Sequence, residues 1–261
     1  MKLTLSFILI LGFFFAKSQS ITYLGNEGVF IEYKGSKILI DALFDEYNFK
    51  FDAPSNSTMT KIMKGTAPFN GIDMVLATHA HRDHFKGQLA VDFLKANQSA
   101  RLVAPPQALD SMKKFPDSFN KISSHIYSFP WKKGWKSVNQ GEIQIQTTYM
   151  LHAGKRNFKV QNQVYMITIG GKKILHLGDT QMERDNFDNL RLEYEEFDAV
   201  IVPFWYLTNV YGAELVRKFM KSKKVIGMHF PKNPNEQPIT KVRQQFPKAV
   251  TFTKVGQKTT F

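Results

Sequence analysis

The chain of 261 residues contains no cysteine, and this absence excludes several kinds of protein. Disulfide bonds cannot form, so stability has to come from an apolar core, which 43% hydrophobic residues including 23 Phe can supply. No thiolate is present to bind a metal, so a metal site would have to use imidazole and carboxylate ligands. A lipid anchor attached to cysteine is excluded as well.

Acidic residues are also scarce, with 22 Asp and Glu against 35 Lys and Arg, which gives a formal net charge of +13. A basic surface attracts anionic substrates, lipid headgroups and nucleic acid. The lysine-rich segments 131–135 and 221–224 are local and form no continuous stripe along the chain. We therefore prefer a scattered, solvated coat of lysines and expect no nucleic-acid partner.

Long apolar runs are absent except at the N-terminus, where Lys2 precedes the apolar segment 3–16 and small residues follow at 16–18. This pattern predicts a signal peptide over residues 1–19, with cleavage before Gln19 or Ser20. The mature protein, residues 20–261, would be periplasmic or secreted and would carry a net charge of 13 − 2 = +11, without a stable membrane span. An uncleaved membrane anchor is the alternative.

The most informative segment, Thr78–His84, follows the apolar run Met74–Ala77 and contains three of the seven histidines. Its ligand-type side chains are His79, His81, Asp83 and His84. His79 and His81 are two residues apart, so at the end of an extended strand their side chains leave on the same side. Imidazole and carboxylate at such short range suit Zn²⁺ and similar divalent metals, whereas a solvated polar loop is the alternative.

Three further residues of the same types lie where an apolar strand pattern ends. They are His152, Asp179 and His229. Ligand-binding groups gather at such strand ends in sheet-based folds. The other two histidines, His125 and His176, lie inside strand patterns, and we expect both to be structural.

The chain resembles the metallo-β-lactamase superfamily, whose pattern is HxHxDH followed by a lone His, a lone Asp and a final His. The opening segment 21–41 is also similar to the family's first hairpins. The similarity covers about residues 20 to 255 and is greatest to the branch of ascorbate-6-phosphate lactonase-like and N-acyl-phosphatidylethanolamine phospholipase D-like hydrolases. That branch usually has His where Asn26 stands here.

The resemblance implies two divalent metal ions, with Zn²⁺ as the expected metal and Mn²⁺ or Fe as alternatives. One ion would bind His79, His81 and His152, and the other would bind Asp83, His84 and His229, with Asp179 bridging the two. Metal coordination lowers the pKa of water towards about 7, which makes a hydroxide nucleophile available. The resemblance therefore implies a binuclear hydrolase of a phosphodiester, ester or lactone, with Asp83 among its catalytic residues.

Two other functions stay open at this point: a non-catalytic, metal-stabilised binding module, and a nuclease of the same superfamily. Within the resemblance, His81 in place of Glu argues against the di-iron oxygen-reducing branch. The complete second ligand set argues against the single-iron dioxygenase branch.

Strand patterns alternate with a few helical ones, and the resemblance implies an α/β fold, the four-layer αββα sandwich. The predicted strands are 21–33, 37–41, 73–78, 101–104, 124–129, 143–151, 162–169, 173–178, 198–203, 224–229 and 249–253. The predicted helices are 86–96, 106–114, 211–222 and 238–246.

The substrate is indicated only weakly. The segment from Asp41 to Gly71 reads as a loop with five aromatic residues, which either cover an apolar or acyl substrate or pack on the domain. Trp205 and Tyr206 could line the same mouth, with the Tyr206 hydroxyl donating to a developing oxyanion and Lys232 binding an anionic group. A small-molecule or lipid-like substrate, in part anionic, is therefore expected.

Overall fold

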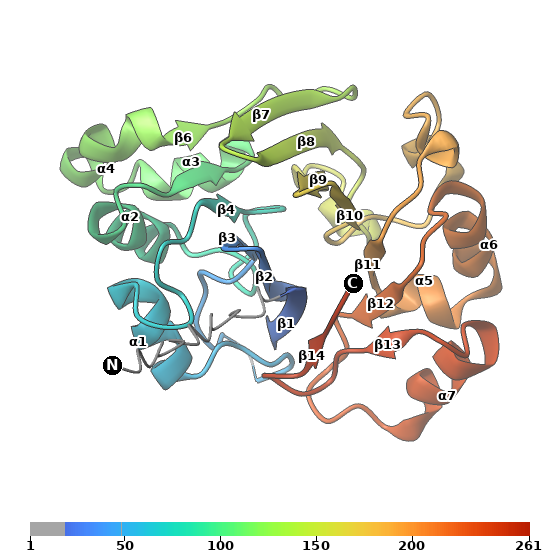
Figure 1. Ribbon diagram of the computed structural model, residues 1–261. Helices are drawn as coiled ribbons and strands as arrows, with labels where there is room; N and C mark the ends of the chain where they lie inside the picture. The colour runs from blue at the N-terminus through green and yellow to red at the C-terminus, as the bar shows by residue number, and fades with distance from the viewer. Residues whose placement is uncertain (1–18, 48) are drawn as a thin grey trace, which may run out of the picture.

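The structure is a computed structural model that describes residues 19–47 and 49–261 (Figure 1). Its centre consists of two seven-stranded sheets packed face to face. In spatial order the first sheet contains β14 (Lys258–Thr259), β1 (Gln19–Gly25), β2 (Gly28–Tyr33), β3 (Ser36–Ile40), β4 (Met74–Leu76), β5 (Arg101–Val103) and β6 (Ile126–Tyr127). The second contains β13 (Val250–Thr251), β12 (Val225–Met228), β11 (Ala199–Pro203), β10 (Lys172–His176), β9 (Gln163–Ile169), β8 (Ile143–Tyr149) and β7 (Lys136–Gln140).

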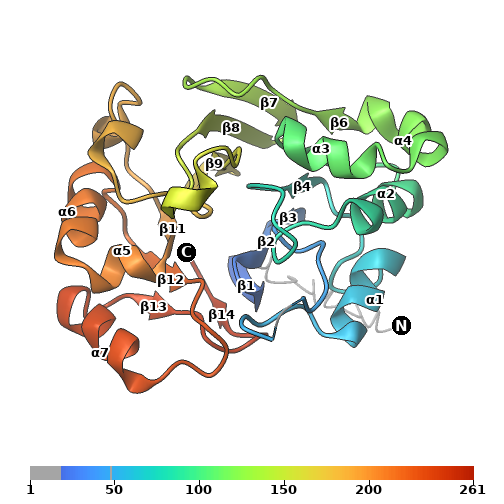
Figure 2. The same ribbon diagram turned by 180° about the vertical axis from the view of Figure 1, so that it is seen from behind.

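Helices cover the outer face of each sheet, as the two opposite views show (Figures 1 and 2). The first sheet is covered by α1 (Asn56–Lys64), α2 (Gly87–Ala96), α3 (Pro106–Met112) and α4 (Pro116–Ile122). The second is covered by α5 (Phe204–Thr208), α6 (Val210–Phe219) and α7 (Glu236–Gln245). The predicted four-layer αββα architecture is confirmed.

Three apolar layers hold these elements together. One lies between the sheets, and each outer layer lies between a sheet and its helices. All five residues of β11 are buried, because this strand pairs in parallel with β10 and β12 and has both faces covered. Full burial of each aliphatic side chain stabilises the fold by roughly 1.5–3 kcal/mol.

Strands β4, β8, β10 and β12 end along one edge of the two sheets, and the loops that follow them meet there. The segment after β4 carries the HxHxDH motif, and the segments after β8, β10 and β12 carry His152, Asp179 and His229. The tight turn between β1 and β2 reaches the same place, because the His229 N–H donates to the carbonyl of Asn26 at 3.2 Å. The fold thus brings five separate segments together at one site.

Several elements differ from the sequence prediction. The segment 41–71, predicted as a loop, contains α1, which is capped by the Ser55 hydroxyl and ends at Gly65 with φ of 58°. The short elements α4, α5, β7 and β14 were not predicted either. His125, predicted in a strand, ends a short 3₁₀ turn, Ser123–His125.

The predicted signal peptide, residues 1–19, lies outside the described residues except for Gln19, which begins β1 opposite Tyr33. The first strand therefore begins one residue before the predicted domain boundary. Among the described residues, no helix is both long enough and apolar enough to span a bilayer.

Candidate metal centre

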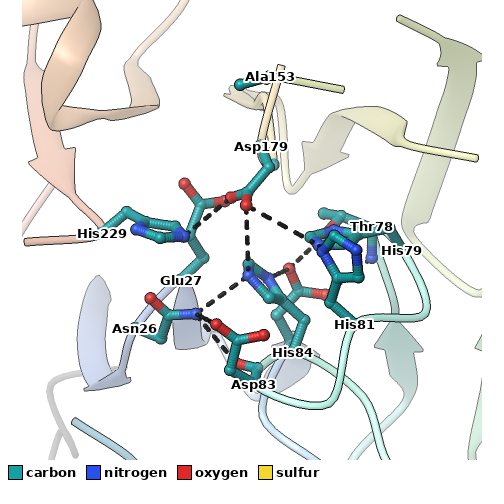
Figure 3. Close-up of polar contacts among 12 residues, drawn as sticks. Asn26, Glu27, Thr78, His79, His81, Asp83, His84, Ala153, Asp179 and His229 are labelled. Atoms are coloured by element: carbon teal, nitrogen blue, oxygen red, sulfur yellow. Dashed lines mark hydrogen bonds and ion pairs between the residues drawn. The ribbon is translucent and has the colours of Figure 1, made fainter. Parts of the chain in front are cut away.

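The seven predicted ligand residues lie together in one group, which we call the His/Asp cluster (Figure 3). It consists of His79, His81, Asp83, His84, His152, Asp179 and His229. The ligand atoms of His79, His81, His152 and Asp179 all lie within 4.8 Å of one another, and we call these four the first ligand group. The same limit holds for Asp83, His84 and His229, the second ligand group.

The HxHxDH segment forms the centre of the cluster because it turns sharply after β4. His79 is fully buried, and the backbone N–H groups of His84 and Phe85 both donate to the carbonyl of His81 at 3.0 and 2.9 Å. This turn carries Asp83 and His84 back towards His79 before α2 begins. The ring centroids of His79 and His84 are 4.0 Å apart.

Asp41, at the end of β3, orients two cluster histidines from behind. Its carboxylate accepts the Thr78 N–H at 2.7 Å and the Thr78 hydroxyl at 2.5 Å, and it lies 2.9 Å from Nδ1 of His84. Because the Thr78 hydroxyl donates to Asp41, its oxygen is left to accept from Nδ1–H of His79 at 2.9 Å. Both rings therefore present Nε2 to the cluster, as metal-binding histidines with a carboxylate or hydroxyl behind them do.

The nitrogens of His79 and His152 that face each other carry no proton. Nδ1–H of His152 donates to the carbonyl of Ala153 at 2.7 Å, and Nδ1–H of His79 is committed to Thr78. Burial, above all other effects, lowers the pKa of both histidines, so both rings are neutral at pH 7. The two Nε2 atoms nevertheless lie 3.3 Å apart, a contact that no hydrogen bond can stabilise.

A cation between these nitrogens would account for the contact. Zn²⁺ binds imidazole nitrogen at about 2.0–2.1 Å, so two nitrogens on one tetrahedral ion lie about 3.3 Å apart. Nε2 of His152 lies 3.4 Å from Oδ2 of Asp179, and Nε2 of His79 lies 3.0 Å from Nδ1 of His81. The residues of the first ligand group therefore fit a tetrahedral metal ion.

Asp179 lies between the two ligand groups. Its Oδ2 is 3.4 Å from His152 and 3.7 Å from Nε2 of His84, while its Oδ1 is 3.2 Å from Nε2 of His229. Burial alone would raise the pKa of Asp179, but His229 and His84 hold it well below the usual range. A carboxylate so placed has one oxygen for each side of the cluster, as a bridging ligand requires.

Gly178 and Asn162 position Asp179. Gly178 has φ of 56°, and a Cβ atom there would lie 2.7 Å from Oδ1 of Asn162 and 2.8 Å from Cβ of Thr78. The buried Asn162 accepts the Asp179 N–H at 3.2 Å through the same oxygen. Glycine is therefore required at 178 both for its conformation and for the close approach.

The histidines of the cluster differ in the direction of their pKa shifts. Burial is the largest cause that lowers the pKa of His81, as it is for the other two histidines of the first ligand group. Burial would lower the pKa of His84 too, but Asp179 and Asp41 raise it to about 10. The metal-free site thus has three neutral imidazoles on one side and an imidazolium between carboxylates on the other.

Three residues that sequence reasoning did not select also belong to the site: Asn26, Glu27 and Asp41. The Asn26 side chain donates to the carbonyl of Asp83 at 3.0 Å and lies 3.0 Å from Nε2 of His84. Glu27 is 1% exposed, and burial followed by Asp179 raises its pKa well above the usual range. The departure from the family's usual His at position 26 was the one signal in the sequence that pointed to this turn.

The predicted substrate contacts have different outcomes. The Trp205 ring packs edge-on against His229, with centroids 5.1 Å apart, so Trp205 does lie beside the cluster. Tyr206 is fully buried, and its hydroxyl donates to the carbonyl of Gln181 at 2.9 Å. The structure therefore does not support the predicted oxyanion contact, because α5 turns this side chain into the outer core. Lys232 is half-exposed and pairs with Glu46 at 3.0 Å.

The aromatic segment between β3 and α1 divides in a similar way. Phe44 is buried in the domain, whereas Phe51 packs edge-on against His229 at 4.5 Å between centroids. Tyr47 lies under the guanidinium of Arg82 at 4.3 Å, and Phe49 is 76% exposed. Part of this segment therefore packs on the domain, and Phe51 lies beside the cluster.

His176 has the structural role predicted for it. Its Nδ1 accepts the Gly178 N–H at 3.1 Å, so its Nε2–H donates to the carbonyl of Glu27 at 3.2 Å. This fully buried ring connects β10 to the β1–β2 turn.

Residues 36–229 match the family described as the beta-lactamase superfamily domain. The match includes the whole His/Asp cluster and covers more than half of the chain. The chain therefore belongs to this superfamily.

Two relatives by sequence have the same description. A UPF0173 metal-dependent hydrolase of Methanosphaera stadtmanae is 26% identical over 167 residues, which are 60% of this chain and 66% of that protein. A UPF0173 metal-dependent hydrolase of Pyrococcus furiosus is 24% identical over 234 residues, 88% of this chain and 91% of that protein. The prediction of a metal-dependent hydrolase of the metallo-β-lactamase superfamily is confirmed at this level.

Solved structures agree on the fold. A protein of Veillonella parvula, described as a possible metal-dependent hydrolase, superposes with a TM-score of 0.65 at 14% identity, covering 93% of this chain and 99% of that one. At this identity the similarity shows the fold alone.

Proposed function

We propose that the chain is an exported hydrolase whose His/Asp cluster holds two divalent metal ions. The observation that carries the proposal is the 3.3 Å contact between the unprotonated Nε2 atoms of His79 and His152. A structural core would not tolerate two opposed lone pairs at this distance, whereas a shared cation makes the contact favourable.

The first ion would bind the first ligand group, and the second would bind the second ligand group, with Asp179 common to both. Asp179 supports this arrangement because its two oxygens face different histidines, Oδ2 towards His152 and Oδ1 towards His229. Zn²⁺ suits the nitrogen-rich first group, and Mn²⁺ or Fe²⁺ are the alternatives.

Bound divalent ions would supply a water of lowered pKa as nucleophile and would polarise the scissile carbonyl or phosphoryl group. The protein's contribution is to fix the ligands. Asp41 and Thr78 orient His84 and His79, and Asn26 holds the backbone of Asp83 in place. We assign Asp83 a catalytic role because it is the partly exposed carboxylate of the cluster, where it can accept a proton from the attacking water.

The substrate that fits the mouth is apolar at one end and anionic at the other. Trp205 and Phe51 flank His229, while Phe49, in the same segment as Phe51, and Phe158, in the segment that follows His152, are exposed. A hollow of about 280 Å³ is lined by Lys132, Lys133 and Leu151, the residue before His152, among other residues.

A phosphodiester with an acyl chain matches both properties, so we rank phosphodiesters above carboxylic esters and lactones. This ranking agrees with the proposed placement in the ascorbate-6-phosphate lactonase-like and phospholipase D-like branch. Lys232 and Trp205 are proposed substrate contacts. Export to the periplasm or medium is proposed from the N-terminal signal pattern, and an N-terminus at Gln19 or Ser20 in the mature protein would support it.

The test uses purified mature protein, reconstituted with Zn²⁺ or Mn²⁺, on a panel of phosphodiesters, esters, lactones and β-lactams. Hydrolysis should disappear in His81→Ala and Asp179→Ala and should persist in His125→Ala, whose imidazole lies outside the cluster. Chelation should abolish the rate before it unfolds the protein. Full metal content without hydrolysis of any substrate class would instead favour a metal-stabilised binding module.

A preference for anionic substrates should weaken with added salt, because attraction by a basic surface is screened. A preference for neutral lactones that salt leaves unchanged would contradict the proposed substrate class, while the binuclear site would stand.

A further inference from the structure

Glu27 is a buried carboxylate that has no hydrogen-bond donor. The residue lies in the turn between β1 and β2 and is 1% exposed. Within the described part of the chain, no group donates a hydrogen bond to Oε1 or Oε2. Burial of an ionised carboxylate without a partner costs several kcal/mol, so such a group needs a cation, a proton or a ligand.

The carboxylate points into the His/Asp cluster. Its ligand atom lies within 4.8 Å of those of His84 and Asp179, and Figure 3 shows Glu27 reaching towards Asp179 from the side of His229. Two buried carboxylates that face each other repel strongly in a low-dielectric interior. A divalent cation between the two carboxylates would attract both of them and so offset their mutual repulsion.

The backbone prevents Glu27 from moving away. His176 donates to its carbonyl at 3.2 Å. On either side, a Cβ atom at Gly25 would lie 2.7 Å from the carbonyl of Asp52, and one at Gly28 would lie 2.7 Å from that of Asp41. Both glycines thus allow the turn to pack directly against neighbouring backbone, which fixes the side chain's direction.

We propose that Glu27 is a further ligand of the second metal ion, together with Asp83, His84 and His229. This inference rests on the proposed binuclear function and deepens it. With Glu27 the site would have three carboxylates, Asp83, Asp179 and Glu27, against the four positive charges of two divalent ions. The second position would be richer in oxygen than the first and would therefore prefer Mn²⁺ or Fe²⁺ more than the first position does.

The test is metal binding by Glu27→Gln, measured by equilibrium dialysis with Zn²⁺ and separately with Mn²⁺, with metal quantified by mass spectrometry. The variant keeps the side chain's shape and removes its charge. The matched control is Glu32→Gln, which removes a carboxylate from the same hairpin, at a position that pairs with Lys37 at 4.0 Å and lies outside the cluster.

Wild-type protein and Glu32→Gln should each bind two ions. Glu27→Gln should bind the first ion as wild type does and the second at least about tenfold more weakly, with the larger loss for Mn²⁺. Without metal, Glu27→Gln should unfold at a higher temperature than wild type, because folding no longer has to remove water from a carboxyl group that lacks a hydrogen-bond donor.

Equal affinity of wild type and Glu27→Gln for both ions would overturn the inference and leave the binuclear site intact. Absence of metal from wild type itself would overturn both proposals. If Glu27→Gln failed to fold, a crystal structure of the Zn²⁺-loaded wild type would decide. A Glu27 oxygen about 2.0–2.2 Å from the second ion would support the inference, and a longer separation would overturn it.

Discussion

The substitution Asp41→Asn tests how the metal ligands are oriented, because it leaves every residue of the His/Asp cluster in place. Asp41 is 1% exposed, and its carboxylate accepts from Thr78 twice while lying 2.9 Å from Nδ1 of His84. An asparagine side chain can keep the contact with the Thr78 N–H, but its amide group donates hydrogen bonds where the carboxylate accepted them. The His84 ring can then adopt the other tautomer, with a proton on the Nε2 atom that should face the metal.

The contacts of Asp41 set the expected losses of metal affinity and of stability. Loss of a carboxylate behind a metal-binding histidine typically weakens metal binding 10–100-fold, which corresponds to about 1.4–2.8 kcal/mol. In the metal-free protein, the lost hydrogen bonds to a charged group should lower the free energy of unfolding by about 3 kcal/mol. For a domain of this size that corresponds to a decrease in Tm of roughly 6–12 °C.

The assay combines metal titration by calorimetry with urea unfolding of the metal-free protein. Asp73→Asn is the matched control, because Asp73 accepts the Lys37 N–H at 2.8 Å and lies away from the cluster. The control should lose about 1 kcal/mol of stability and no metal affinity. A folded Asp41→Asn variant with wild-type metal affinity would refute the orienting role of Asp41.

Three further predictions concern stability and pH. Gly178→Ala should lower the free energy of unfolding by about 1–3 kcal/mol and weaken metal binding, because the added Cβ would displace the neighbours that position Asp179. Calorimetry of the metal-free and the metal-loaded variant checks both effects. Asp198→Asn should lower the free energy of unfolding by about 1–2 kcal/mol at pH 7. Burial would raise the pKa of Asp198, but hydrogen bonds from the Lys223 side chain and the Lys173 N–H help to lower it to about 2. The stabilisation by Asp198 is therefore present above pH 3.8 and is lost towards pH 2. The unfolding free energies of wild type and Asp198→Asn, measured with urea over pH 2–7, should converge at the acid end. The unfolding free energy of metal-free wild type should have its maximum near pH 6.5. Below this pH the unfolded state binds protons that the buried imidazoles of the first ligand group do not bind in the folded state, so stability decreases. Above this pH the unfolded state releases the proton that His84 keeps in the folded state up to about pH 10, so stability decreases again. A stability profile without this maximum would contradict the assigned protonation states.

The cluster could be predicted from the sequence because metal binding restricts the residue types. Five of the seven histidines and two aspartates lie just after strand patterns, and the strand ends meet along one edge of the fold. The resemblance to a known family then supplied their grouping around two metal positions. The structure shows these residues within coordination reach of one another.

Glu27, Asn26 and Asp41 could not be selected in the same way, because carboxylates and amides are common on any protein surface. Their importance depends on burial, which follows from contacts between segments far apart in the chain. Glu27, for example, is enclosed by His84 and Asp179, which lie 57 and 152 residues further along the sequence. Only the folded arrangement shows that this carboxylate lacks a donor.

The missed elements have physical reasons too. Helix α1 is polar and buries only Ile62, so its apolar pattern is weak, although Ser55 and Gly65 carried the signals for its ends. Strands β7 and β14 lie at sheet edges and are short or mostly exposed, so their pairing with neighbours defines them more than their own residues do.

We propose that the His/Asp cluster holds two metal ions that together drive hydrolysis. The most direct measurement is the initial rate on the best substrate as metal-free protein receives increasing equivalents of Zn²⁺ or Mn²⁺, with bound metal quantified in the same samples. We expect the rate to rise to a plateau at about two ions bound per chain. A plateau at one ion, or two bound ions without any rate on the full panel, would contradict it.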